Sequence, residues 1–144
     1  MLKVTITGLE SSLRKIQNNY EAASKEIDAE MGAVTESMIT TSKQLLPAQY
    51  GALRSSLRVK KNRNFSYTLG TNIEYAPYIE FGTGPYAKKY VPTLEREWQD
   101  YALTFKKSIP GNTYQSPYFY PSIRSWSIIL LNNLSRILKR YERY

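Results

Sequence analysis

The sequence predicts an α+β fold in which a long N-terminal amphipathic helix and a C-terminal helix pack on a small antiparallel sheet, with an inserted helical excursion before the last helix. Two observations lead to this prediction. Strand-like segments are grouped between helical ones, which is typical of α+β domains. Apolar residues also recur at spacings of three and four along the N-terminal part, as in an amphipathic helix. The 144 residues suit one domain, so we treat 1–144 as a single domain.

The N-terminal part is expected to form a short strand and then the long helix. Residues 2–7 alternate apolar and polar side chains, and Gly8 ends this strand. Residues 17–19 are weak helix formers at which the helix can divide in two. Gly32 costs about 1 kcal/mol relative to alanine within a helix, and close approach of a neighbour is one reason for a glycine there. Pro47 ends the helix. The apolar stripe consists of Leu9, Leu13, Ile16, Tyr20, Ala23, Ile27, Met31, Val34 and Met38.

The middle of the chain is expected to form two paired strands. Residues 52–63 are interpreted as a strand with a basic face, residues 62–64 as a hairpin turn and residues 65–71 as the return strand. No acidic residue occurs between positions 49 and 73. Such a basic patch can contact DNA, contact an acidic partner or only keep the protein soluble. Its exposed members are predicted to be Arg58, Lys60, Lys61 and Arg63.

The next segment, residues 75–84, is predicted to be a tight helical turn. Pro77 suits the first position of a helix, and Gly82 and Gly84 suit positive φ at its exit. The alternative is a strand with Pro77 at a sheet edge. We expect Phe81 to be buried against the long helix. We expect the Glu80 carboxylate to find donors among nearby backbone N–H groups or Arg54.

The last part of the chain is predicted to contain two helices. Residues 85–115 are interpreted as an excursion, a protruding arm, with a helix over residues 92–107 and a turn at residues 110–112. The apolar stripe of that helix is Leu94, Trp98, Tyr101 and Phe105. Pro121 is expected to open the last helix, whose apolar stripe is Ile123, Trp126, Leu130, Leu134, Ile137 and Tyr141.

The composition argues against an enzyme. The chain has no histidine and no cysteine, so zinc and iron–sulfur sites are not expected, and no cofactor is implied. The acids on the predicted helix, such as Glu95, Glu97 and Asp100, suit a solvated face. Gly82-Thr83-Gly84 lacks the glycine and lysine of a phosphate loop. The longest aliphatic run, 128–131, is too short to span a membrane, and the N-terminus has no signal-peptide pattern.

Net charge and tyrosine content favour an interaction protein. The net charge is +8, and eight of the 13 tyrosines lie between positions 75 and 120. Tyrosine combines a large ring with a polar tip, so it is enriched at protein–protein contacts, although it also suits half-buried strands and loops. Nucleic-acid binding is the main alternative to a protein interface. No DNA-reading or RNA-reading motif is present, so sequence-specific recognition is not expected.

Three segments, in order, resemble the tail-completion or head–tail joining (neck) proteins of long-tailed bacteriophages. Residues 46–57 are similar to a segment with a proline, a short turn and Gly-x-Leu-Arg-x-Ser. Residues 75–84, Tyr-Ala-Pro-Tyr-Ile-Glu-Phe-Gly-Thr-Gly, resemble the family's signature. Residues 116–123 are similar to its proline-rich approach to the last helix. The matching positions are Gly51, Leu53, Arg54, Ser56, Tyr75, Ala76, Pro77, Tyr78, Glu80, Phe81, Gly82, Thr83, Gly84, Pro117 and Pro121.

The resemblance implies a structural virion protein located at the neck, at the top of the tail, and assembled in the cytoplasm of the bacterial host. It implies a homo-oligomeric ring, which we expect to be six-fold, between the head connector and the tail tube. Its partners would be adjacent neck or connector proteins, the tail terminator or the tail tube. The basic charge is compatible with passive contact to genomic double-stranded DNA passing through such a ring, and no membrane partner is expected. The matching residues would determine fold and assembly. Two departures are the Ala-Gln-Tyr turn at residues 48–50 and the long excursion.

Two alternatives remain from the sequence. One is a tail terminator that caps the tail tube. The other is a sequence-independent DNA-binding protein, for which affinity should fall steeply with salt.

Overall fold

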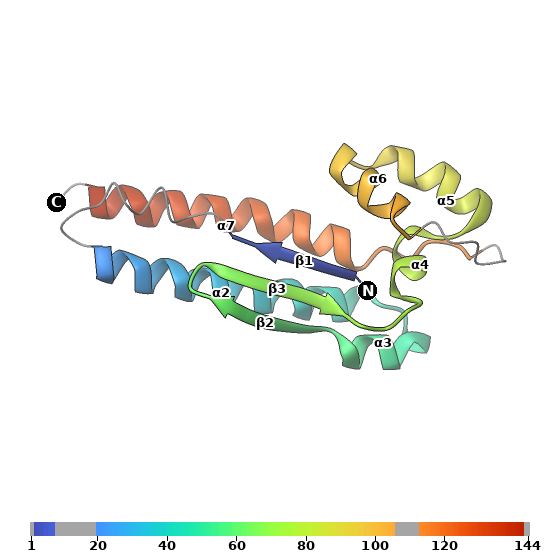
Figure 1. Ribbon diagram of the computed structural model, residues 1–144, viewed down its shortest axis with the longest axis horizontal. Helices are drawn as coiled ribbons and strands as arrows, with labels where there is room; N and C mark the ends of the chain where they lie inside the picture. The colour runs from blue at the N-terminus through green and yellow to red at the C-terminus, as the bar shows by residue number, and fades with distance from the viewer. Residues whose placement is uncertain (1, 8–19, 106–112, 143–144) are drawn as a thin grey trace.

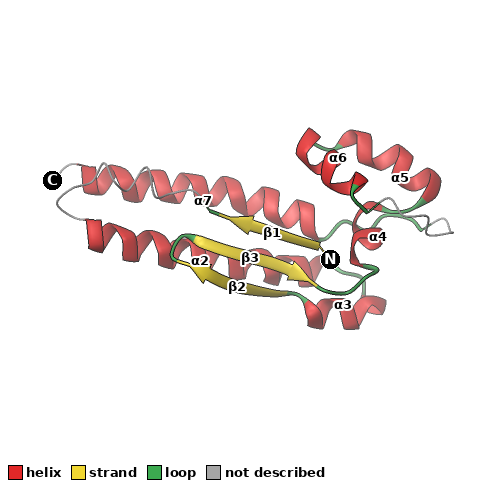
Figure 2. Ribbon diagram, viewed as in Figure 1, coloured by secondary structure: helices red, strands yellow, loops and turns green. Residues whose placement is uncertain are grey.

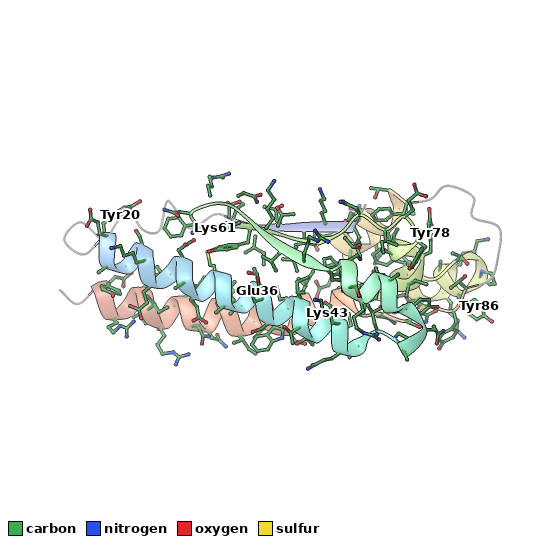
Figure 3. All side chains as sticks on the ribbon, turned by 90° about the horizontal axis from the view of Figure 1, so that it is seen from below. Tyr20, Glu36, Lys43, Lys61, Tyr78 and Tyr86 are labelled. Carbon is green, nitrogen blue, oxygen red and sulfur yellow. The ribbon has the colours of Figure 1, made fainter. Side chains whose placement is uncertain are left out.

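The computed structural model describes residues 2–7, 20–105 and 113–142 and consists of two layers. One layer is a three-stranded antiparallel sheet in the order β1-β3-β2, formed by β1 (Leu2–Ile6), β2 (Arg58–Arg63) and β3 (Ser66–Thr71). The other contains α2 (Tyr20–Leu45) and α7 (Phe119–Glu142), which lie side by side and antiparallel (Figures 1 and 2). Figure 3, turned by 90° from Figure 1, shows that the two helices cover one face of the sheet. This arrangement confirms the predicted α+β fold.

The smaller helices lie at one end of these layers (Figure 1). A 3₁₀ turn (Ala48–Tyr50) leads into α3 (Gly51–Ser56), and α4 (Ala76–Phe81) follows the sheet. The excursion consists of α5 (Gly84–Tyr90), a 3₁₀ turn (Val91–Thr93) and α6 (Arg96–Leu103). Among the described residues, no helix is both long and apolar enough to cross a membrane.

The buried face of α2 confirms most of the predicted stripe. Its buried apolar side chains include Ala23, Ile27, Met31, Val34 and Met38. Tyr20 is 43% exposed, so the prediction that it belongs to the buried stripe was wrong. The predicted stripe residues Leu9, Leu13 and Ile16, together with Gly8 and residues 17–19, lie outside the described residues. The helix ends before Pro47, as predicted.

Gly32 has the close neighbour that the sequence suggested. A Cβ at this position would lie 3.1 Å from the Tyr67 hydroxyl oxygen, which comes from β3. That hydroxyl donates to the backbone carbonyl of Asp28 at 3.0 Å, one turn earlier on α2. The missing side chain therefore lets the sheet approach the helix closely.

The prediction of one strand over 52–63 was wrong in its first half. Residues 51–56 form α3, and the strand begins only at Arg58. The prediction of the hairpin turn at residues 62–64 was also wrong. The turn lies at Asn64 and Phe65, and Phe65 takes a φ of 64° there. The Asp28 carboxylate accepts the Phe65 N–H at 2.9 Å, and the Phe65 side chain is buried. These tertiary contacts hold a conformation that a bulky residue seldom adopts.

The turn at residues 75–84 is helical, as predicted, and the strand alternative was wrong. Pro77 lies in the first turn of α4, and Gly82 takes a φ of 78° and Gly84 of 57°. The excursion differs in detail. The helix α5 was not predicted. The helix predicted over residues 92–107 spans only Arg96–Leu103. It begins late because Pro92 lies in a 3₁₀ turn, after which Leu94 is extended and buried. The predicted turn at 110–112, with Lys106 and Lys107, lies outside the described residues.

The last helix has the predicted apolar face but starts earlier. Ile123, Leu130, Leu134 and Ile137 are buried, whereas Trp126 and Tyr141 are partly buried. The helix begins at Phe119 rather than at Pro121, so the proline lies within its first turn. The earlier start is caused by a side chain of α4 that binds the beginning of α7.

Candidate functional site

The three motif segments gather at one end of the molecule (Figure 1). The first motif contributes α3, the second contributes α4 and the start of α5, and the third leads into α7. The chain therefore brings together three segments that are far apart in sequence. We take this end of the molecule, with the basic strand β2, as the candidate assembly site.

The Glu80 carboxylate joins the second motif to the third. It accepts the backbone N–H groups of Tyr118 at 2.8 Å, Phe119 at 2.9 Å and Tyr120 at 2.7 Å. These groups lie at the beginning of α7, where backbone N–H groups have no partner within the helix. A carboxylate at a helix N-terminus is also favoured by the helix dipole. Glu80 therefore caps α7, which explains why the helix begins ahead of Pro121.

Glu80 is fully buried, and its partners are not those of an ion pair. Burial raises the pKa of its carboxyl group, whereas the three N–H donors act in the opposite direction. Within the described residues it forms no salt bridge. Of the two donor sources expected from the sequence, the backbone supplies the bonds, and Arg54 does not.

The glycine-rich exit from α4 is fastened to the segment before α7. The Thr83 N–H donates to the Thr113 carbonyl at 2.9 Å, and the Thr113 N–H donates to the Thr83 hydroxyl at 2.7 Å. A Cβ on Gly82 would lie 3.0 Å from that same Thr113 carbonyl oxygen. Ser116 N–H also donates to the Ile79 carbonyl at 2.8 Å. Gly82 is thus required both by its positive φ and by this close approach.

Phe81 is buried, as the sequence predicted, and its ring packs on the excursion. Its ring lies 6.4 Å from those of Trp98 and Tyr101 and 6.3 Å from that of Phe105, all from the excursion. Trp98 in turn packs edge-on against Tyr120, with ring centroids 4.9 Å apart. The excursion projects beyond the sheet, yet its apolar face is part of the core.

Other motif residues near α4 support the same packing. Ala76 and Pro77 are buried, and the Tyr118 hydroxyl donates to the Ala76 carbonyl at 3.0 Å. Burial raises the pKa of Tyr118. Tyr75 is 40% exposed, and Tyr78 directs its hydroxyl toward the Phe105 carbonyl at 3.4 Å. Pro117 and Pro121 are both half-buried.

The first motif closes the end of α2. Arg54 donates to three backbone carbonyls at 2.8–3.1 Å, which belong to Lys43, Leu46 and Pro47. A cation at a helix C-terminus satisfies carbonyls that have no partner in the helix. Leu53 is fully buried.

Two further positions of the first motif differ in what they contact. Ser56 bonds with Thr71 of β3 through their hydroxyls at 2.6 Å. Gly51 is in right-handed helical geometry, and no atom lies within 4 Å of the place that a Cβ would occupy. Packing within the described chain therefore does not require a glycine there.

The four basic residues of β2 are exposed but not equivalent. Lys61 donates to the Asp28 carboxylate of α2 at 2.5 Å. Burial alone would raise the pKa of Asp28, but its bonds with Lys61, Phe65 and Tyr67 outweigh that effect and hold the pKa below its ordinary value. Within the described residues, Arg58, Lys60 and Arg63 form no salt bridge. These three therefore remain available to a partner.

A groove of about 510 Å³ lies where α4, α5 and α6 meet. Pro77, Tyr78, Lys88, Val91 and Leu103 are among the side chains that line it. No group of three acidic, histidine or cysteine residues suited to a metal occurs in the described part of the chain. The groove is lined mainly by apolar and aromatic side chains.

Sequence reasoning missed three residues that organise the site. Asp28 holds the hairpin, Thr113 fastens Thr83, and Tyr101 contacts β1 through hydrogen bonds with Lys3. Tyr101 was placed on an apolar stripe, but nothing in its spacing indicated a partner 98 positions away. Asp28 and Thr113 carry no local signal because their partners are distant in sequence.

Comparisons of the chain with protein-family models, with curated proteins and with solved structures found no match.

Proposed function

We propose that this chain is a structural protein of the neck of a long-tailed bacteriophage, which forms a ring at the head-proximal end of the tail and completes the tail for head–tail joining. The observation that carries the proposal is the link between its motifs. The Glu80 carboxylate, in the second motif, accepts hydrogen bonds from the backbone N–H groups of residues 118–120. These residues belong to the third motif, where it enters α7. The residues behind the resemblance thus act together in the fold.

Exposed aromatic and apolar side chains at the motif end support a role in protein contacts. Tyr75 is 40% exposed, Tyr86 38%, Leu103 54% and Tyr114 66%. The rings of Tyr86 and Tyr114 lie 5.2 Å apart, so they form one paired aromatic surface. Tyrosine is enriched in the cores of protein interfaces. We assign this surface to contacts with neighbouring subunits or adjacent neck proteins in a ring that we expect to be six-fold.

Complementation of a phage that lacks this gene tests the proposal. Without a completion protein, filled heads and tails of normal length should accumulate unjoined, and the wild-type chain should restore joined particles in electron micrographs. Without a tail terminator, tube growth would not stop, so tails of irregular length would assign the chain to that alternative role.

Two exposed tyrosines provide a matched pair of variants for this assay. Tyr86→Ser changes the motif end, whereas Tyr20→Ser changes an equally exposed tyrosine at the opposite end (Figure 3). We expect only Tyr86→Ser to reduce the yield of joined particles. Equal yields of joined particles from both variants would show that the aromatic surface at Tyr86 is not needed for joining.

The DNA-binding alternative is tested with the isolated chain. Salt-dependent binding of a labelled duplex that persists at physiological salt would favour a free DNA-binding protein.

A further inference from the structure

The two edges of the sheet are closed to different degrees. In the order β1-β3-β2, both β1 and β2 are edge strands. At the β1 edge, the Lys3 N–H donates to the Tyr101 hydroxyl at 2.7 Å, and that hydroxyl donates to the Lys3 carbonyl at 3.0 Å. A side chain from α6 thus satisfies both backbone groups of Lys3. The excursion closes this position of the β1 edge.

The same contact shows which backbone groups of β2 point outward. Because the Lys3 groups meet Tyr101, they point away from β3. Lys3 is opposite Gly70, which is opposite Arg58, so the register turns the backbone groups of Arg58 toward β3. Successive residues alternate, and the backbone groups of Val59 and Lys61 therefore point away from the sheet. Within the described residues, no hydrogen bond meets these groups.

The side chains of β2 indicate what could pair with this edge. Arg58 and Lys60 are exposed on the solvent face, whereas Val59, on the face toward the helices, is half-buried and packs against the core. An added strand that alternates acidic and apolar residues would place its acids beside the basic side chains and its apolar residues beside Val59.

A second copy of β2 does not fit this edge. Antiparallel pairing of two copies of β2 would bring the four basic side chains of one copy beside the four of the other. The strand contains no acidic residue that could offset this repulsion. Like charges on facing strands are destabilising. The charge pattern therefore favours an acidic partner over self-pairing.

We propose that the free edge of β2 is a docking site for an extended, acidic segment of a partner protein, which adds as a fourth strand through the backbone groups of Val59 and Lys61. This mode of recognition combines backbone hydrogen bonds for affinity with alternate side chains for specificity. The inference goes beyond the proposed neck function and is tested separately from it, with the isolated full chain.

Designed peptides provide the probe. The first is a labelled eight-residue peptide that alternates glutamate with valine, measured by fluorescence anisotropy. Three controls are the same peptide methylated on alternate backbone amides, a peptide of the same composition in block order, and a lysine–valine peptide. We expect the first peptide to bind and each control to bind at least about tenfold more weakly. Equal binding of the methylated peptide would overturn strand addition.

Variants of the chain test the same site from the protein side. Val59→Pro removes an outward N–H that the sheet does not use, a position at which proline is tolerated on an edge strand. Val59→Ala is its matched control, because it removes the side chain but keeps the N–H. We expect Val59→Pro to abolish peptide binding and Val59→Ala to retain most of it. Equal loss in both would overturn the backbone docking mode.

Amide exchange gives a readout that does not depend on variants. The amides of Val59 and Lys61 should exchange rapidly in the free chain and slowly with the peptide bound, while that of Lys60 should be protected in both. No change at Val59 and Lys61 would overturn the proposal. A labelled 20-base-pair duplex is the remaining comparison. If the duplex binds, loses affinity in the Arg58→Glu/Lys60→Glu variant and the acidic peptide does not bind, the strand is a polyanion surface and the proposal fails.

Discussion

The carboxylate of Glu80 and the backbone N–H of Tyr120 lie 2.7 Å apart although they are 40 positions apart in the sequence. This contact, with those to Tyr118 and Phe119, makes the short helix α4 the N-terminal cap of the 24-residue helix α7. Helices usually take their caps from the residue just before them. Here the cap comes from another element, so the position of α4 and the start of α7 depend on each other.

Replacing Glu80 should therefore loosen the first turn of α7. In Glu80→Gln, the side-chain oxygen can still accept a backbone N–H. The NH₂ group that replaces the second oxygen is itself a donor, so it cannot bond with the N–H groups that this oxygen accepted. Because unpaired buried groups cost about 1–3 kcal/mol each, we expect unfolding free energy to fall by about that amount. Urea unfolding measures the change, and amide exchange at residues 118–120 localises it. Unchanged exchange there would show that the cap is dispensable.

Phe81→Ala should be the most destabilising change among the motif residues. It removes a buried ring that contacts three aromatic side chains of the excursion, and such truncations cost about 3–5 kcal/mol. Phe81→Leu is the control, since it keeps much of the apolar volume and should cost less. The measurement is thermal melting together with the near-ultraviolet circular dichroism of the aromatic cluster. Parental melting of Phe81→Ala would mean that the excursion packs independently of α4.

Two glycines of the motifs should respond in opposite ways to alanine. Gly82→Ala forces a Cβ into positive φ and toward the Thr113 carbonyl, and the conformational part alone costs about 1–2 kcal/mol. Gly51→Ala is in helical geometry with open space, so it should be neutral or stabilise by about 0.4–1 kcal/mol. Chemical denaturation of both variants, each against the parent, tests the difference. Equal effects would show that neither backbone environment matters.

The basic side chains of β2 should separate into two kinds. Lys60→Glu changes an exposed side chain without a salt bridge in the described structure, so its melting temperature should stay near that of the parent. Lys61→Glu would place a second carboxylate beside Asp28, so its melting temperature should be lower. Differential scanning fluorimetry at low salt compares the pair. A variant that changes Lys60, Lys61 and Arg63 together to glutamate should therefore be less stable than the parent, because it includes Lys61.

Asp28 should make stability sensitive to acid. Its pKa is lower in the folded chain than its ordinary value of 3.8, so the unfolded chain binds a proton more readily than the folded one. The resulting stabilisation is present above pH 3.8 and is lost as the pH falls through the folded-state pKa. Asp28→Asn should lower stability at neutral pH and remove this part of the pH dependence. The check is urea unfolding at several pH values below 5, as a difference between parent and variant; parallel profiles would contradict the assignment.

The elements with strong local patterns could be predicted from the sequence. The apolar spacing of Ala23 through Met38 placed α2, alternation placed β1, and Pro77 with Gly82 placed the turn of α4. In each case the information lies within one helical face, one strand face or one turn, where neighbouring residues determine the backbone. The same applies to the absence of histidine and cysteine, which limits the available chemistry whatever the fold.

The contacts between distant segments were decided only by the tertiary structure. The ring of Phe81 packs on the excursion, and Glu80 binds backbone groups of α7 rather than Arg54. Asp28 holds the hairpin turn at Phe65. Residues 51–56 form a helix and not a strand, with Arg54 at the carbonyl end of α2. Hydrogen bonds and ring contacts of this kind depend on which surfaces meet in space. A spacing pattern shows that a side chain is apolar or charged, but only the packed chain selects its partner.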